Sequence, residues 1–243
     1  MLKSIGCAWP HLELFKLWNL QFKGRADGLL SRNRFIRHQI PRLLAEDIRE
    51  VRKQFRRFLQ TPEGRARLIQ RRYLSDFLDN HAGFGEFKPG SVGAAYIEFM
   101  RTESLSAHDL TWHAEHNCKQ YHDLDEDLQW FIARQRDIYD LLYVLTGYQR
   151  NPIGETALLV FMTGQGTSSV IKYLSILRFF NLRKTCKGNT GLIDVYSEAY
   201  QNGQRAAHII GQDILNLLYE PLDEVRQQLN IQAPVDYYDA IEG

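Results

Sequence analysis

The 243-residue chain has little of what marks several specialised protein classes. Its three cysteines, Cys7, Cys118 and Cys186, are too few and too scattered for a disulfide framework, so we expect a reducing compartment and inert thiols. The longest uncharged run, 156–171, has 16 residues, short of the about 20 mostly apolar residues that a spanning helix needs. The first 20 residues show neither a signal-peptide layout nor an Arg- and Ser-rich transit peptide, which predicts a cytoplasmic protein.

Excess charge of one sign is also absent, since 30 bases and 29 acids leave a net charge of +1. That balance hides blocks, because residues 32–72 carry +9, 73–140 carry −8, 141–193 carry +5 and 194–243 carry −7. Such blocks indicate either solvated, self-complementary helix faces or a basic face for an anionic surface, and they favour a homodimer. No nucleic-acid-reading motif accompanies the basic block, so we expect no nucleic-acid partner.

Sustained alternation of apolar and polar residues, the mark of half-buried strands, is missing as well. Apolar residues recur at helical spacing instead, and Thr61-Pro62-Glu63 and Ser91 are typical helix starts. We therefore predict an all-α, single-domain helical bundle over residues 1–243. Its central helix is expected at about 124–147 with an antiparallel partner from about 152, and further helices at 167–182, 191–202, 203–219 and 221–229.

The segment most informative about function lies in and after the expected central helix. Four polar residues share one face because they are spaced i, i+3, i+4 and i+7: Arg136, Tyr139, Asp140 and Tyr143. A short turn then brings Glu155 back beside them in the next helix. From spacing alone, the set is either an Arg136–Asp140 ion pair among core tyrosines or a metal site on Asp140 and Glu155.

At these residues the sequence resembles the coenzyme Q (ubiquinone) biosynthesis protein 4 family. That family carries His-Asp-x-x-His, then eleven residues, then Glu, and the matching positions here are Tyr139, Asp140, Tyr143 and Glu155. Two further segments look like the family's, Pro-Gly-Ser-Val-Gly-Ala-Ala-Tyr at 89–96 and Gln-Asn-Gly-Gln-Arg-Ala at 201–206, which leads to Leu218-Tyr219-Glu220. The resemblance is strongest over residues 60–231.

The chain departs from the family where both motif histidines are replaced, by Tyr139 and Tyr143. The resemblance implies zinc at this motif, a part in oxidatively removing the ring carboxyl group of a polyprenylated quinone precursor, and assembly with other quinone-biosynthesis proteins at a membrane. Zinc prefers imidazole or thiolate, and a phenol with a pKa near 10 is a poor ligand. We therefore expect no zinc here. The remaining oxygen donors, Asp140 and Glu155, suit Mg²⁺ shared with a lipid phosphate.

Apolar segments after the motif point to a lipid. Residues 157–162 are uninterruptedly apolar, and the apolar, aromatic stretch 171–180 ends in the bases Arg183, Lys184 and Lys187. That pattern is typical of a membrane-surface helix, of an ordinary core helix with a solvated end, or of the wall of an apolar tunnel. The expected tunnel lining is Leu142, Leu158, Phe161, Met162 and Tyr173.

Two functions from different classes follow. The first is a carrier or scaffold that binds an isoprenoid lipid or prenylated quinone precursor, peripherally associated with the inner face of a membrane. The alternative is an enzyme that oxidatively decarboxylates the head group of such a precursor. A separate cluster, His113, His116, Cys118 and His122, lacks the spacing of the known zinc motifs, so we expect no metal there.

Overall fold

Helices make up the regular structure of this chain. The computed structural model describes residues 49–74, 77, 87–103, 124–167, 169–185 and 191–242, and in these residues no strand ladder occurs. The elements are α4 (Pro62–Gln70), α6 (Val92–Thr102), α9 (Glu126–Thr146), α10 (Pro152–Gly164), α11 (Ser169–Thr185), α12 (Leu192–Arg205), the 3₁₀ helix η3 (Ile209–Gly211), α13 (Ile214–Leu217), α14 (Leu222–Gln228) and α15 (Val235–Glu242). Residues 49–60 are helical as well. The all-α prediction is confirmed.

Some predictions fall outside the described residues. These are the cysteines Cys7, Cys118 and Cys186, the histidine cluster at 113–122, and Lys187. Among the helices that the structure describes, none is long and apolar enough to cross a bilayer.

The central helix α9 begins and ends for local reasons. The Asp125 side chain accepts the Leu128 N–H at 2.9 Å and caps the first turn. Gly147 closes the helix in the left-handed conformation, with φ of 80°, which glycine adopts without steric cost. Most side chains of α9 are buried, as expected for a helix surrounded by other elements. The expected helix at 124–147 is therefore confirmed.

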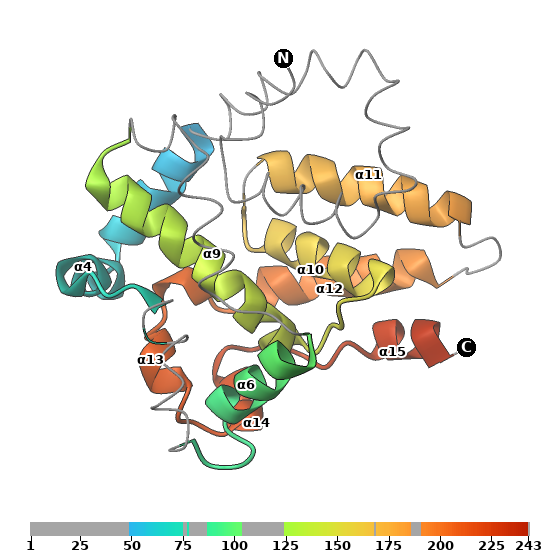
Figure 1. Cartoon of the computed structure of the whole chain (residues 1–243). Coiled ribbons are helices and arrows are strands. Elements are labelled where there is room, and N and C mark those ends of the chain that lie inside the picture. Colours follow the sequence, from blue (N-terminus) through green and yellow to red (C-terminus); the bar gives the residue numbers. More distant parts are fainter. Residues whose placement is uncertain are drawn as a thin grey trace.

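The other helices pack around α9 in two groups (Figure 1). On one side, α10 lies between α11 and α12, and α15 packs on α12. On the other, α6 and α14 contact α9 and each other, while η3 contacts both α9 and α4. The main core joins α6 and the carboxyl-terminal half of α9 to α10, α12 and the last segments. A smaller core joins residues 49–60 to the amino-terminal half of α9.

The prediction of a helix over 203–219 is wrong. The helix α12 ends at Arg205, and irregular chain, η3 and α13 follow it. Gln165, at the end of α10, accounts for the stop. Its side-chain amide donates to the carbonyl oxygens of Gly203 and Ala206, and its Oε1 accepts the Ile209 N–H. Another helix thus supplies the hydrogen bonds at this helix end. The helix α15 has no counterpart among the predictions.

Two of the segments that carry the family resemblance are brought together. The N–H groups of Val92 and Gly93 donate to the carbonyl oxygens of Glu220 and Leu218 at 3.0 and 2.8 Å. Ser91 caps α6 by accepting the Ala94 N–H at 3.2 Å. These residues therefore have a structural role in joining α6 to the chain before α14.

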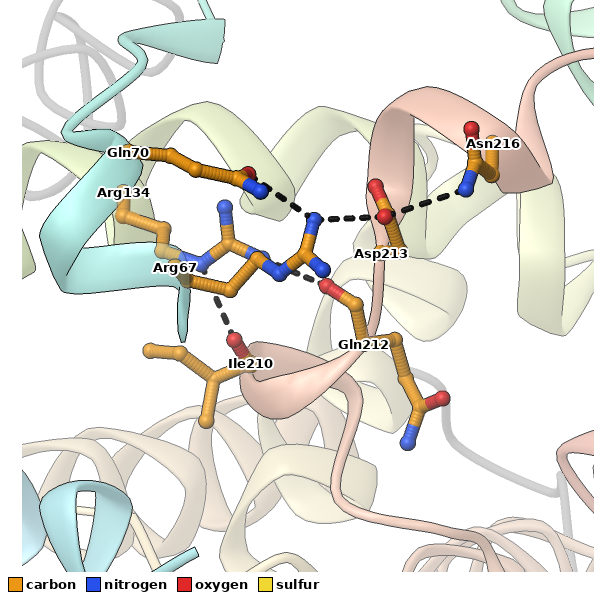
Figure 2. Close-up of polar contacts among 7 residues, drawn as sticks. All are labelled: Arg67, Gln70, Arg134, Ile210, Gln212, Asp213 and Asn216. Atoms are coloured by element: carbon orange, nitrogen blue, oxygen red, sulfur yellow. Dashed lines mark hydrogen bonds and ion pairs between the residues drawn. The ribbon is translucent and has the colours of Figure 1, made fainter. Parts of the chain in front are cut away.

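A buried arginine ties α9 to the irregular chain after α12 (Figure 2). Arg134 is 4% exposed, and it donates to the carbonyl oxygens of Ile210 and Gln212 at 2.9 and 2.6 Å. Arg67 of α4 lies beside it and pairs with Asp213. Burial, and then the neighbouring Arg67 charge, lower the pKa of Arg134 to about 10, so its charge remains inside the protein at neutral pH.

Candidate functional site

Local structure brings the motif residues to the junction of α9 and α10. Asn151 caps α10 by accepting the Gly154 N–H at 2.8 Å, and Pro152 occupies its first position. Glu155 consequently lies in the first turn, where the helix dipole favours a carboxylate. The partner helix begins at Pro152, as predicted.

The carboxyl end of α9 is held by a residue from the far end of the chain. Arg226 of α14 donates to the carbonyl oxygens of Val144 and Leu145, both at 3.0 Å. These carbonyls have no partner within α9. Arg226 therefore stabilises the turn that follows Tyr143.

The two motif phenols lie against each other in the core. The hydroxyl oxygens of Tyr139 and Tyr143 are 3.4 Å apart, their rings meet edge to face, and Phe99 of α6 stacks on Tyr143. Burial raises the pKa of Tyr139 to about 12 and the pKa of Tyr143 well above its usual value, and the Glu155 charge raises both further. Both phenols are therefore protonated at neutral pH.

Glu155 has a partner that the spacing argument did not name. Arg178, from the middle of α11, forms an ion pair with it, and both side chains are largely buried. The Arg136–Asp140 ion pair that spacing allowed is not formed; Arg136 pairs with Asp137 instead, at 3.4 Å. The positively charged group that pairs with Glu155 therefore comes from α11.

Asp140 is a buried carboxyl group, 9% exposed. Within the described part of the chain it forms no hydrogen bond or ion pair. Burial raises the pKa of Asp140 from 3.8 to about 6; the Arg150 charge opposes the rise and the Asp137 charge adds to it. Arg150 itself pairs with Glu103 at 3.7 Å.

Because the pKa of Asp140 is higher in the folded protein, its ionisation opposes folding. The folded chain binds this proton more tightly than the unfolded chain, so stability falls as the pH rises from about 4 to 6. The loss is about 3 kcal/mol above that window. We expect Asp140→Asn to raise the free energy of unfolding at pH 7.5 by up to about 3 kcal/mol. Urea unfolding at pH 4 and 7.5 measures this.

The exposed Asp194, on α12, supplies the matched control, because Asp194→Asn removes a carboxylate that water already solvates. It should not raise stability at pH 7.5, because Asp194 lies in the first turn of α12, where the helix dipole favours a carboxylate. Equal stability of wild type and Asp140→Asn at pH 7.5 would contradict the assigned cause.

The donor set does not fit a resident metal ion. The described residues contain no group of three His, Cys, Asp or Glu side chains able to share one ion. Glu155 is engaged by Arg178, and the charges that act on the buried Asp140 carboxyl are those of Arg150 and Asp137. Mg²⁺ on Asp140 and Glu155, shared with a ligand phosphate, stays a prediction.

The residues expected to line a lipid tunnel fall in two places. Four lie in the main core, one on α9 and three on α10: Leu142, Leu158, Phe161 and Met162. Tyr173 lies half-buried on α11. Contact of these five side chains with a lipid stays a prediction.

Sequence reasoning missed Arg178 as a site residue, although a signal was present. Arg178 follows the buried Ile171 by seven residues and precedes the buried Leu182 by four, so it falls on the buried stripe of α11. A base on a buried stripe indicates a buried acidic partner.

Comparison with known proteins agrees with this geometry. Residues 45–235 match the family described as coenzyme Q (ubiquinone) biosynthesis protein Coq4. A Bos taurus protein named ubiquinone biosynthesis protein COQ4 homolog, mitochondrial, is 29% identical over 209 residues, covering 82% of this chain and 72% of that protein. The Rattus norvegicus protein of that name is 26% identical over 92% of this chain and 82% of its own length.

A fungal relative and a solved structure extend the comparison. The Podospora anserina protein named ubiquinone biosynthesis protein COQ4, mitochondrial, is 27% identical, covering 73% of this chain and 56% of that protein. A crystal structure of a protein from Nostoc punctiforme has a TM-score of 0.55 at 18% identity, over 76% of this chain and 82% of that one, and shows the same fold. Because the family match spans most of the sequence, this chain belongs to the Coq4 family of ubiquinone biosynthesis proteins.

Proposed function

We propose that this chain carries or presents a prenylated quinone precursor, or another isoprenoid lipid, to the enzymes of ubiquinone biosynthesis at a membrane surface. Family membership supports the pathway. The observation that carries the membrane part is the outer face of α11, defined by Lys172, Ile176, Phe180, Arg183 and Lys184.

This outer face combines exposed apolar and basic side chains. Ile176 is 54% and Phe180 55% exposed, and all three bases of the face are exposed. The helix contains no acidic residue. Apolar side chains flanked by bases are typical of a helix lying in the headgroup region of an anionic membrane, which favours the anionic inner leaflet as the partner.

The lipid part of the proposal is supported by what lies beneath this face. The buried side of α11 packs on α10, whose apolar run 157–162 begins two residues after Glu155. An isoprenoid chain entering from the membrane beside α11 would thus meet apolar side chains first and the polar motif at their end. A homodimer and further quinone-biosynthesis partners stay predictions.

Binding to vesicles tests the membrane part. For Ile176→Ser with Phe180→Ser, we expect binding to phosphatidylcholine vesicles with about one-third phosphatidylglycerol to fall by about 10-fold or more, since apolar burial provides much of the affinity. Wild-type binding should also weaken with salt, because about 1 kcal/mol per base is electrostatic. Flotation assays measure both effects.

Exposed apolar residues on α12 offer a matched control, Ile193→Ser with Tyr200→Ser, which removes comparable apolar surface elsewhere. That variant should bind as the wild type does. Equal loss in both double variants, or no loss in either, would contradict the assignment of the membrane face to α11.

Extraction of the purified protein tests the lipid part. Organic-solvent extraction with lipid mass spectrometry should yield a polyprenyl lipid in near-stoichiometric amount, and elemental analysis of the same sample should find no stoichiometric zinc or iron. No lipid together with stoichiometric zinc or iron would overturn the carrier function. Release of labelled carbon dioxide from a carboxyl-labelled prenylated benzoate would establish the decarboxylase alternative.

A further inference from the structure

The centre of the motif holds a positive charge that belongs to the chain itself. Arg178 reaches from α11 to Glu155 of α10, and both charges act on the phenol of Tyr139. We propose that the Arg178 guanidinium takes the place, in this chain, of the metal ion that a histidine-containing form of this motif would hold.

The first argument is where the guanidinium lies. The resemblance assigns four positions to the metal motif, and Glu155 is the one supplied by a second helix. Its carboxylate is occupied by Arg178, and the charges of both residues act on the Tyr139 phenol. A dication at these positions would have to displace the guanidinium or sit beside it, and a guanidinium beside a dication repels it strongly in a buried site.

The second argument is the pairing of charges around the motif. Three of the four nearby carboxylates already have an arginine: Arg136 with Asp137, Arg150 with Glu103 and Arg178 with Glu155. Only Asp140 is left among these four. A buried dication needs several anionic or imidazole donors to replace its water, and this arrangement offers one carboxylate and two protonated phenols.

The third argument is what the guanidinium does for the fold. A metal ion shared by ligands from two helices fixes their relative position. The Arg178–Glu155 pair fixes a different contact of the same glutamate, that of α11 with α10, with both side chains largely buried. The planar guanidinium presents donors in a fixed geometry that suits a carboxylate.

Metal binding in a restored motif tests the proposal. We expect Tyr139→His with Tyr143→His to bind zinc weakly, and adding Arg178→Ala to tighten binding by about 10-fold or more, because the repelling charge is gone. Adding Arg183→Ala instead, which removes an exposed base of the same helix, should leave affinity unchanged. Equilibrium dialysis gives the affinities, and the cobalt(II) absorption spectrum reports the ligand geometry. Equal affinity with and without Arg178 would overturn the proposal.

The wild-type protein provides a second measurement that needs no destabilised variant. Neither the wild type nor Asp140→Asn has a complete metal-binding motif, so their cobalt(II) and zinc titrations should be the same. Asp140→Asn is suited to this comparison because it is expected to be more stable than the wild type. Stoichiometric wild-type binding that Asp140→Asn abolishes would overturn the proposal. No lipid enters either experiment, so its outcome is independent of the carrier function.

Discussion

Gly203→Ala is expected to lower the free energy of unfolding by about 3 kcal/mol or more, because the added methyl group overpacks a helix contact. A Cβ at Gly203 would lie 2.1 Å from the carbonyl oxygen of Phe161. That atom belongs to the backbone of α10 and cannot rotate away, so α10 and α12 would have to separate. The same interface is equally close at Gly164, where a Cβ would lie 2.5 Å from the Tyr200 carbonyl oxygen.

The sign of this effect is informative, since helix propensity alone predicts that Ala stabilises a helix by about 1 kcal/mol relative to Gly. Thermal and urea unfolding measure it. Gly211→Ala is the matched control, because a Cβ there meets no atom within 4 Å, and it should be neutral or slightly stabilising. A Gly203→Ala protein as stable as the wild type would contradict the close contact.

Arg134→Met is expected to cost about 3–5 kcal/mol of stability, comparable with breaking other buried charged networks. The substitution leaves the Ile210 carbonyl oxygen without its side-chain donor and the Gln212 carbonyl oxygen with the Ile214 N–H alone. It also removes the guanidinium that lies 5.9 Å from the centre of the Trp130 ring. Relief of repulsion with Arg67 recovers part of this loss. Urea unfolding followed by circular dichroism gives the value.

An exposed arginine on another helix supplies the comparison. Arg101 pairs with Glu98 one turn away, and both side chains are well exposed, so Arg101→Met should change stability much less than Arg134→Met does. Arg134→Lys keeps the charge, but an ammonium group lacks the forked geometry that reaches two carbonyl oxygens. Its loss of stability should therefore lie between those of Arg101→Met and Arg134→Met. Similar values for Arg101→Met and Arg134→Met would show that the buried contacts contribute little.

Local signals allowed a correct prediction of the elements that local chemistry determines. Thr61 caps α4 and Ser91 caps α6 as expected, and Gly147 ends α9 within one residue of the predicted end. The helical content and the α9–α10 junction follow from such signals together with apolar periodicity.

What could not be predicted depends on neighbours distant in sequence. The amide of Gln165 ends α12 from another helix, and periodicity wrongly predicts a second continuous helix over residues 203–219. The partner of Glu155 was not predicted, because spacing within α9 paired Arg136 with Asp140 and did not consider a base 23 residues beyond Glu155. The site's residue types were evident in the sequence, whereas its charge pairing required the packing of α11 on α10.

During synthesis on the ribosome, α9 emerges long before the residue that completes its carboxyl end. Arg226 follows Leu145 by 81 residues, which at ordinary rates of translation is about 4–16 s. For that time the last turn of α9, which carries Tyr143, lacks two of its hydrogen-bond donors. The Val92 and Gly93 N–H groups similarly lack their acceptors, the carbonyl oxygens of Glu220 and Leu218, until those residues are synthesised. The motif therefore becomes ordered late, and a nascent chain stalled before α14 would hold every motif residue without the contact that ties the end of α9.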